Sequence, residues 1–425
     1  MNATQPTVEL RSYLQENLPG YLDLLRRMVA VNSFTGNAAG VDALGRLTAE
    51  LFAPLGFLAE TIPPADARHG HHIMLERTGR PGPAGRPAPL IGLISHLDTV
   101  FPEAEEEAND FHYRVEGDRI YGPGTVDIKG GTVMIYMVLD GLRRFFPDVY
   151  EGITWRILLN AAEEVLARDF GELCRGRLGG ALAALVFEGG DVEDGRFLMV
   201  SARKGMARYQ ITVEGRGAHA GAFHQGGANA IVQLADVIGI VAGFTDYDRD
   251  LTFNVGTVRG GTVMNRVPHQ ATAGVEMRAY DMAAFEEGVT NMLSLNEYCS
   301  VRSVEDGYPC HIDVQVEGRW TPWPPNDATI GLLDIWNEAA RELGMKAVAR
   351  QARGGLSDGN WLWDRVPTLD GLGPEGDNSH SSERSVDGGK DQEYVLASSF
   401  VPKAMLNIVA VTRLVHAAGS GTGGG

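Results

Sequence analysis

Histidines and carboxylates at the ends of apolar segments are the residues of this sequence best suited to chemistry. The segment PLIGLISHLD ends in His96 and Asp98. Residues i and i+2 of an extended strand point to the same side, so these two side chains would project together. A histidine held by a nearby carboxylate is a common form of metal ligand. Taken alone, however, the pair more often marks a histidine that caps a loop at the end of a strand.

The remaining candidates also follow predicted strands or lie in glycine-rich turns. Asp127 lies in GPGTVDIKGG, whose glycines permit a tight turn, although a helix-capping aspartate is the simpler interpretation of Asp127 alone. Glu163 and Glu164 directly follow TWRILLN, where adjacent carboxylates repel each other and lose hydration. Most pairs of adjacent acidic residues lie at solvated helix starts, but the position of this pair at the end of a buried strand favours a functional role. Glu188 ends ALVFEGG, and His380 lies in DNSHSSERSV.

As a set, these residues indicate a metal site. Oxygen and nitrogen donors without thiolate suit Zn²⁺, with Mn²⁺ and Co²⁺ as substitutes. Two histidines and three carboxylates match the requirement of two ions that share one bridging carboxylate. Such ions lie about 3.5–4 Å apart and hold one water between them.

A layered α/β sheet is predicted to position these residues. The apolar segments are continuous, as expected of parallel strands buried on both faces. The predicted strands are the segment ending at His96, 154–160 and 181–191, and the predicted helices are 8–31, 41–52 and 130–146. Their alternation predicts an α/β fold with a mixed, mostly parallel sheet and helices on both faces. Such sheets bind ligands at the carboxyl ends of their strands.

The pattern changes after Ser201, where apolar residues alternate with period two. Strands are predicted at 209–215, 251–261 and 271–280, and helices at 228–243 and 281–296. Two helices on an antiparallel sheet form an α+β unit, after which a helix at 328–343 and a short strand at 366–372 resume the first pattern. We therefore predict an outer domain of residues 1–205 and 319–425, with residues 206–318 inserted into it.

Composition narrows the class of protein. The 425 residues carry a net charge of 37 − 55 = −18, which repels phosphate backbones and argues against a nucleic-acid partner. No run of 18 apolar residues predicts a membrane span, and the N-terminus lacks the pattern of a secretory signal. The cysteines, Cys174, Cys299 and Cys310, form no CxxC motif. A cytoplasmic protein is expected, with a flexible tail at 419–425.

The motifs, taken in order, resemble those of the M20 metallopeptidases from about residue 90 to 386. The matching segments are His96-Leu-Asp98-Thr-Val, Asp127-Ile-Lys-Gly-Gly, Glu163-Glu164, Glu188, Gly217-Ala-His219-Ala-Gly221, Asn265-Arg-Val-Pro268 and His380-Ser-Ser-Glu-Arg. The segment HLDTVFP is most similar to the glutamate carboxypeptidase (carboxypeptidase G2) branch of the family. The family also includes acetylornithine deacetylase and succinyl-diaminopimelate desuccinylase.

The resemblance implies a role for each candidate in the outer, catalytic domain. Asp127 would bridge two metal ions, most simply Zn²⁺. His96 and Glu188 would complete one site, while Glu164 and His380 would complete the other; Asp191 is an alternative to Glu188. Asp98 would orient His96, and Glu163 would act as the general base and acid on a water that bridges the two ions.

The resemblance also implies that residues 206–318 form a lid and dimerisation domain. His219 would reach across a homodimer to stabilise the oxyanion in the partner's active site. Arg278 and Asn265 match positions that bind the free carboxylate of a substrate, although a sheet-surface charge and a turn cap are alternatives. The glycine-rich loop 353–360 is also expected to line the substrate site.

These roles imply a metal-dependent hydrolase that cleaves an amide bond next to a free carboxylate of a small peptide or N-acyl amino acid. An N-acyl-amino-acid deacylase or aminopeptidase with the same centre is the alternative, and a non-catalytic metal-stabilised binding protein is a remote one. Two loops depart from the family pattern, Val165–Phe170 after the glutamate pair and Gly189–Asp191 after Glu188, so the substrate stays open. We interpret His69, His71 and His72 as surface residues.

Overall fold

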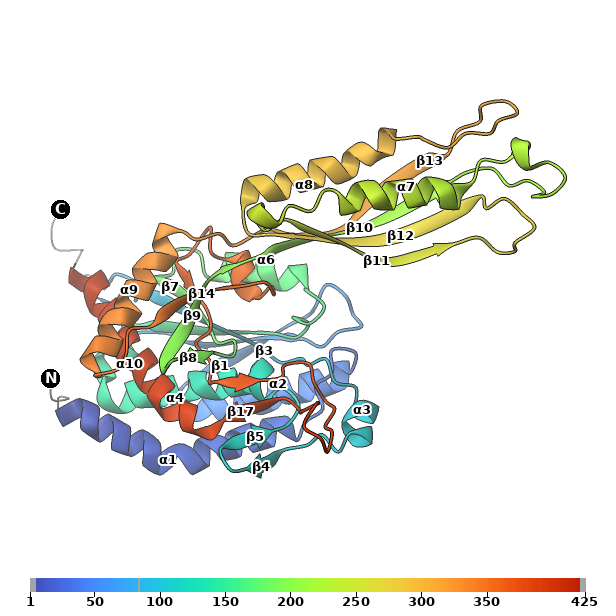
Figure 1. The fold of residues 1–425 in the computed structure, drawn as a ribbon. Coiled ribbons are helices and arrows are strands. Elements are labelled where there is room, and N and C mark those ends of the chain that lie inside the picture. Colours follow the sequence, from blue (N-terminus) through green and yellow to red (C-terminus); the bar gives the residue numbers. More distant parts are fainter. Residues whose placement is uncertain (1–4, 83–84, 421–425) are drawn as a thin grey trace. The chain divides into compact units, whose positions relative to one another are not determined.

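The computed structural model describes residues 5–82 and 85–420, which fold into two compact units (Figure 1). Unit 1 is drawn from Met1–Ser201, Pro325–Ala352 and Ser357–Gly425, and unit 2 from Ala202–Pro324 and Arg353–Leu356. Helix α10 ends at Ser420, so the first two residues of the predicted tail are helical, and residues 421–425 lie outside the described part. The roles predicted for the two domains stay predictions.

Unit 1 contains most of the helices and a six-stranded sheet. In chain order its elements are α1 (Gln5–Val29), α2 (Ala38–Phe52), β1 (Leu58–Ile62), β2 (His72–Arg77), β3 (Leu90–His96), α3 (Glu103–Ala108), β4 (Arg114–Glu116), β5 (Arg119–Tyr121), α4 (Gly130–Phe145), α5 (Pro147–Gly152), β6 (Thr154–Asn160), α6 (Arg168–Arg177), β7 (Ala183–Val186), β8 (Val192–Glu193), β9 (Arg196–Arg203), α9 (Asp327–Glu342), β14 (Ala349–Arg353), β15 (Thr368–Leu369), β16 (Gly376–Asp377), β17 (Tyr394–Leu396) and α10 (Ala397–Ser420), with β9 and β14 ending in unit 2.

The main sheet has the strand order β1-β2-β6-β3-β7-β15. Strands β6, β3, β7 and β15 pair in parallel, whereas β2 is antiparallel to both of its neighbours. Side chains alternate between two cores: Leu93 of β3 packs in the core that includes α1, α4, α9 and α10, while Ile94 packs in the core that includes α6. Helices therefore cover both faces (Figure 1), and the predicted α/β fold is confirmed.

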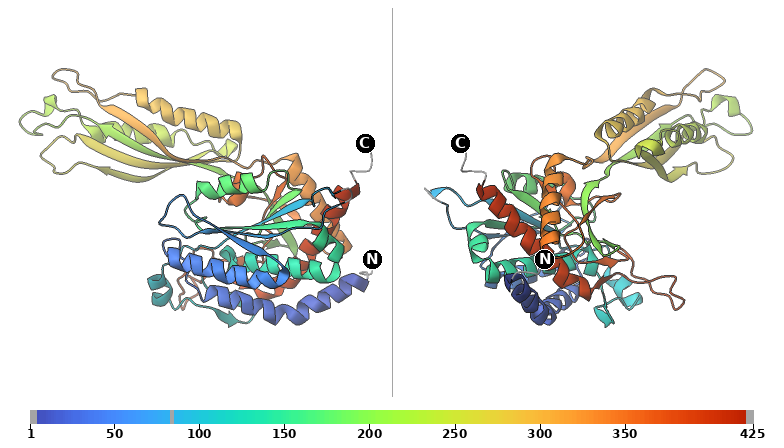
Figure 2. Two further views of the ribbon diagram at one scale, coloured as in Figure 1. Left: turned by 180° about the vertical axis from the view of Figure 1, so that it is seen from behind. Right: turned by 60° about the vertical axis from the view of Figure 1, so that its left-hand side comes forward.

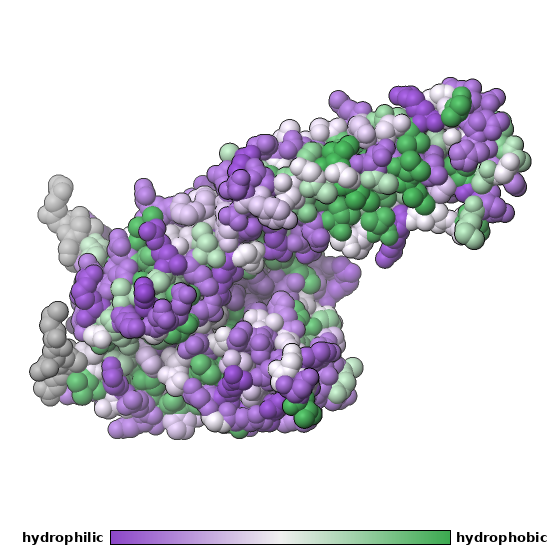
Figure 3. All heavy atoms as spheres, in the orientation of Figure 1, coloured by the Kyte–Doolittle hydropathy of each residue, from purple (hydrophilic) through white to green (hydrophobic). Residues whose placement is uncertain are grey.

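Unit 2 is an antiparallel sheet with two helices on one face (Figures 1 and 2). Its elements are β10 (Gly205–Glu214), α7 (Ala230–Ala242), β11 (Thr252–Gly260), β12 (Gln270–Ala279), α8 (Met282–Ser294) and β13 (His311–Trp320), with strand order β11-β12-β10-β13. Alternate residues of β10 and β12 are buried, which matches the period-two pattern in the sequence. Apolar side chains also gather on the outer surface over α7 (Figure 3).

Helix α10 is the only described helix whose length and apolar composition would suit a membrane span. Within Ala397–Gly419, 72% of the apolar window is buried in the protein. The helix packs against α9, α4 and α1, so the core of unit 1 accounts for its apolar character.

Candidate metal centre

Three of the five candidate ligands, His96, Glu164 and Glu188, lie at or shortly after the carboxyl ends of neighbouring parallel strands. His96, the last residue of β3, pairs with Asn160, the last residue of β6. On the other side of β3, Ile94 pairs with Val186 at the end of β7, two residues before Glu188. Because this register aligns the strand ends, the turns that follow them meet at one edge of the sheet.

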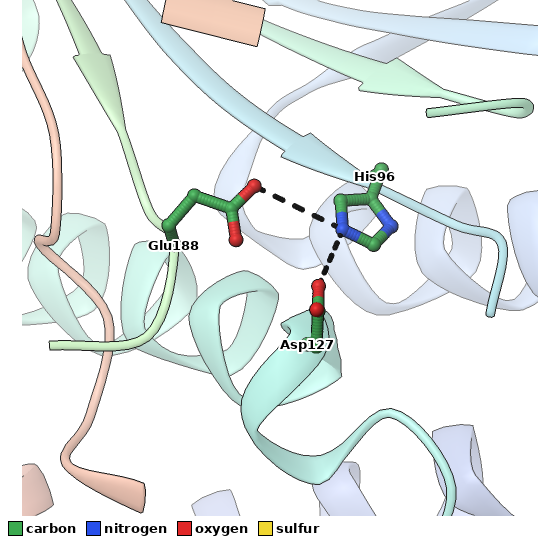
Figure 4. A group of neighbouring side chains, drawn as sticks. All are labelled: His96, Asp127 and Glu188. Atoms are coloured by element: carbon green, nitrogen blue, oxygen red, sulfur yellow. Dashed lines mark hydrogen bonds and ion pairs between the residues drawn. The ribbon is translucent and has the colours of Figure 1, made fainter. Parts of the chain in front are cut away.

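The first group of donor atoms comes from His96, Asp127 and Glu188. Figure 4 shows both carboxylates directed toward one nitrogen of the His96 ring. This nitrogen, Nε2, lies 2.9 Å from Oδ1 of Asp127 and 3.9 Å from Oε1 of Glu188. The His96 side chain is only 1% exposed. The group therefore offers one nitrogen and two carboxylates in a largely dry setting.

The second group comes from Asp127, Glu164 and His380. Nε2 of His380 lies 3.3 Å from Oδ2 of Asp127 and 3.1 Å from Oε2 of Glu164. In each group the donor atoms lie within 4.8 Å of one another. Asp127 belongs to both groups and directs a different oxygen to each histidine. One shared carboxylate between two nitrogen-containing groups fits a pair of divalent cations of the zinc class.

The electrostatics of the cluster also suit cations. Burial raises the pKa of Glu164, and the nearby Asp127 carboxylate raises it further. Hydrogen bonds to Asp127 and Glu164 raise the pKa of His380 to about 11. Burial alone would raise the pKa of Asp127, but hydrogen bonds from His380 and His96 outweigh it and hold this pKa well below its usual range. These partly buried carboxylates share the positive charge of only two histidines. A divalent cation between them would supply the additional positive charge.

Asp98 shapes the turn that follows β6. Its Oδ1 accepts the N–H of Glu163 at 3.0 Å, and its Oδ2 accepts the N–H of Glu164 at 3.2 Å and the hydroxyl of Thr35 at 2.7 Å. Nδ1 of His96 lies 3.0 Å from the backbone carbonyl oxygen of Asp98 and 3.5 Å from its Oδ1. Asp98 therefore contacts the expected histidine mainly through its backbone, and its carboxylate fixes the glutamate pair.

The side chain of Glu163 is half-buried beside this cluster. Burial raises the pKa of Glu163 well above its usual range, and the Asp358 and Glu188 carboxylates also raise it. Among the described residues, none donates a hydrogen bond to the Glu163 carboxylate, whereas the neighbouring Glu164 is paired with His380. The two consecutive glutamates therefore have different surroundings.

The comparison with known protein families bears directly on this centre. The model of peptidase family M20/M25/M40 matches residues 92–407, which include all five candidate ligands. The chain belongs to peptidase family M20/M25/M40. It is therefore an enzyme, and the remote alternative of a non-catalytic binding protein is set aside.

Curated relatives and solved structures of the M20 group agree with this assignment. Carboxypeptidase G2 from Pseudomonas sp. (strain RS-16) is 28% identical over 372 residues, which cover 86% of this chain and 84% of that protein. Acetylornithine deacetylase from Klebsiella pneumoniae (strain 342) is 26% identical and covers 60% of this chain and 66% of its own length. The structure of aminopeptidase PepT from Bacillus cereus has a TM-score of 0.73 at 20% identity, covering 94% of this chain and 99% of that one.

The other predicted residues of this M20 chain lie in unit 2. His219 is exposed, and its Nδ1 accepts the N–H groups of Gly221 at 3.2 Å and Ala222 at 3.0 Å. Asn265 is exposed in a turn. These residues are not members of the two donor groups of unit 1, and their roles stay predictions.

Arg278 lies on β12, where its guanidinium is held by neighbours within unit 2. Nε donates to Oε1 of Glu276 at 2.7 Å, and Nη1 donates to the carbonyl of Gly354 at 2.8 Å. Arg208 donates to the other oxygen of Glu276 at 3.2 Å. The predicted carboxylate binder is therefore restrained in position, and its side chain keeps an exposed fraction of 30%.

The sequence interpretation of His72 was wrong. His72 is 1% exposed, because its ring packs on Phe170 and its Nδ1 accepts the N–H of Ala161 at 3.1 Å. Its Nε2 lies 3.2 Å from Oδ2 of Asp169. His72 therefore supports the start of the turn that carries the glutamate pair. Its neighbour His71 is partly exposed, as expected.

Three buried or paired carboxylates complete the surroundings of the centre. Asp191, the alternative ligand, accepts a hydrogen bond from Gln351 at 2.6 Å and is not a member of either donor group. Asp358, in the predicted substrate loop, accepts from Asn160 at 2.9 Å, and burial raises its pKa to about 7. Sequence reasoning missed Glu393 altogether, although it is 0% exposed and contacts the backbone of Asp127.

Proposed function

We propose that this enzyme is a C-terminal exopeptidase of the glutamate carboxypeptidase type, which hydrolyses an amide bond next to a free carboxylate. The observation that carries the proposal is the sharing of Asp127 between two histidine-containing donor groups, with Glu163 directly beside them. The 28% identity with carboxypeptidase G2 over most of both chains supports the choice of branch.

The proposed cofactor is a pair of divalent ions, most simply Zn²⁺, with Co²⁺ or Mn²⁺ as substitutes. His96 and Glu188 would hold one ion and Glu164 and His380 the other, with Asp127 between them. When bound, such ions lower the pKa of a water and polarise the substrate carbonyl. The absence of thiolate from the donor set agrees with this choice of metals.

Glu163 is the proposed general base and acid. Its carboxylate takes a proton from the attacking water as the oxygen bonds to the carbonyl carbon, and delivers that proton to the nitrogen as the C–N bond breaks. The raised pKa of Glu163 suits a group that must both accept and return a proton.

His219 is the proposed donor to the oxyanion, acting in the partner's active site of a homodimer. Because its Nδ1 accepts two backbone N–H groups, the ring proton of neutral His219 lies on Nε2. This tautomer leaves the Nε2–H free to donate a hydrogen bond to an oxyanion.

Arg278 and Asn265 are the proposed binders of the substrate carboxylate. Replacing Arg278 with alanine is expected to lower kcat/KM roughly 10–100-fold, because a hydrogen bond to a charged group contributes about 1.5–3 kcal/mol. Arg208→Ala is the matched control, since Arg208 contacts the same Glu276. The measurement is steady-state kinetics on a C-terminal glutamate dipeptide and its C-terminal amide. An equal loss on both substrates, or in both variants, would contradict the assignment.

The same centre would also serve an N-acyl-amino-acid deacylase, and the similarity to acetylornithine deacetylase favours this second candidate. An aminopeptidase would need a free amine in its substrate instead. A panel of C-terminal glutamate dipeptides, N-acyl amino acids and free-amine dipeptides separates the three. Preference for the N-acyl amino acids would replace the exopeptidase proposal by the deacylase.

Dimer formation through unit 2 is part of the proposal, together with a cytoplasmic location. The outward side of α7 is apolar, with Ile231 40% and Val232 48% exposed, and β11 adds Val258 at 56%. A helix that is apolar on both sides usually packs on both. We expect light scattering to give the unchanged protein the mass of a dimer and the Val232→Glu variant the mass of a monomer. The control variant Leu58→Glu, which changes an exposed residue of unit 1, should stay dimeric. A monomeric unchanged chain would contradict this.

A further inference from the structure

Glu393 is a buried carboxylate that the proposed chemistry does not use. It precedes β17 and is 0% exposed. Its Oε1 accepts the N–H of Val126 at 2.9 Å and the N–H of Asp127 at 3.1 Å. Its Oε2 is buried and has no hydrogen-bond partner among the described residues. One side-chain oxygen thus receives two consecutive backbone donors of the turn that presents the shared ligand.

This turn needs an acceptor from outside because its backbone is irregular. Asp127 has φ −123° and ψ 85°, which are not helical angles, although α4 begins only three residues later at Gly130. Buried N–H groups require partners, and a helix start leaves its first donors without intrahelical acceptors. Glu393 supplies that acceptor from a position 266 residues further along the chain.

The backbone of Glu393 is tied to the loop of the other histidine ligand. Its N–H donates to the carbonyl of Ser381 at 2.8 Å, next to His380, and its carbonyl accepts the N–H of Gly122 at 3.3 Å. One residue therefore contacts the turn that carries Asp127 and the loop that carries His380. Glu393 thus links the turn of one ligand to the loop of the other by hydrogen bonds of its side chain and its backbone.

We infer that Glu393 is a positioning residue of the metal centre, which sets the orientation of the Asp127 carboxylate between His96 and His380. The inference rests on the proposed two-metal function and adds to it a residue that touches neither metal nor substrate. Groups of this kind, which hold the ligands of a metal, change metal affinity when they are altered.

Zinc affinity of the purified chain and its variants tests the inference. Glu393→Met keeps the length of the side chain and removes both acceptors, so we expect apparent Zn²⁺ affinity, measured by competition with a chromophoric chelator, to fall about 10–100-fold. Glu393→Gln keeps an oxygen acceptor, so its affinity should stay near that of the unchanged chain. The absorption spectrum of the Co²⁺-loaded chain should shift in Glu393→Met and be restored in Glu393→Gln.

A matched control separates positioning from general stability. Asp140→Leu removes a buried acceptor of the Tyr13 and Tyr21 hydroxyls, at 2.8 and 2.7 Å, away from the centre. It should lower the free energy of unfolding without changing Zn²⁺ affinity or the Co²⁺ spectrum. If Glu393→Met fails to fold, Glu393→Asp replaces it in the test, because the shorter side chain keeps the carboxylate but moves it away from the N–H groups of the turn. A shifted Co²⁺ spectrum in this variant would support the inference.

Four results would overturn the inference. Normal Zn²⁺ affinity in Glu393→Met would reject it while leaving the proposed function intact. An unchanged Co²⁺ spectrum in Glu393→Asp, or an equal loss of affinity in Asp140→Leu, would reject it in the same way. If the unchanged chain bound no Zn²⁺, the proposed function would fail together with the inference.

Discussion

Replacing Glu163 with glutamine is expected to remove nearly all turnover while both metal ions stay bound. General acid and base catalysis typically contributes about 10²–10⁴-fold to a rate, and the amide of glutamine neither accepts nor returns the proton. The backbone N–H of residue 163 still donates to Asp98, so the turn should keep its shape. The measurement is kcat on the preferred substrate, together with metal content by elemental analysis.

The control for this variant is Glu172→Gln, which neutralises an exposed carboxylate on α6. It should keep full activity, because it removes the same charge from a residue that belongs to neither donor group. A Glu163→Gln enzyme that retained normal kcat would show that another residue handles the proton. Loss of metal from the Glu163→Gln variant would instead show that Glu163 is a metal ligand.

Removal of the metal ions is expected to abolish activity and to destabilise the chain. A ligand present at 100 times its Kd stabilises the folded state by about 2.7 kcal/mol for each site, so chelation should lower Tm. Addition of Zn²⁺ or Co²⁺ should restore both Tm and activity. Activity that survives exhaustive chelation would reject the two-metal proposal.

Metal content of three variants tests how the ions are shared. Asp127→Ala should lose both ions, because both donor groups include this carboxylate. Glu188→Ala should lose one ion, and Asp191→Ala should keep both, since Asp191 contacts Gln351 instead. Loss of an ion in Asp191→Ala but not in Glu188→Ala would show that Asp191, and not Glu188, is the metal ligand.

The strand ends that carry the centre were predictable because the parallel strands are continuous apolar segments that stop at polar residues. The segment 154–160 is β6 in the structure. The segment 181–191 was predicted too long, since β7 covers only Ala183–Val186 and Glu188 lies in the loop beyond it. Only the end of this strand was misplaced, because a short apolar run does not show at which residue the pairing with the neighbouring strand stops.

Contacts distant in sequence explain what the sequence did not predict. Burial of His72 depends on Ala161 and Asp169, and no feature of the stretch around residue 72 indicates it. Glu393 gives no local signal either, because its partners are backbone groups near residue 127. A carboxylate that accepts from main-chain N–H groups imposes no pattern on the side chains of its partners.

The division of donors along the chain has a consequence for biosynthesis. The first group spans residues 96 to 188, whereas the second needs His380. All of unit 2 is translated between them. A nascent chain therefore contains every donor of the first group long before it contains every donor of the second, and the proposed two-metal centre is one of the last features that translation can complete.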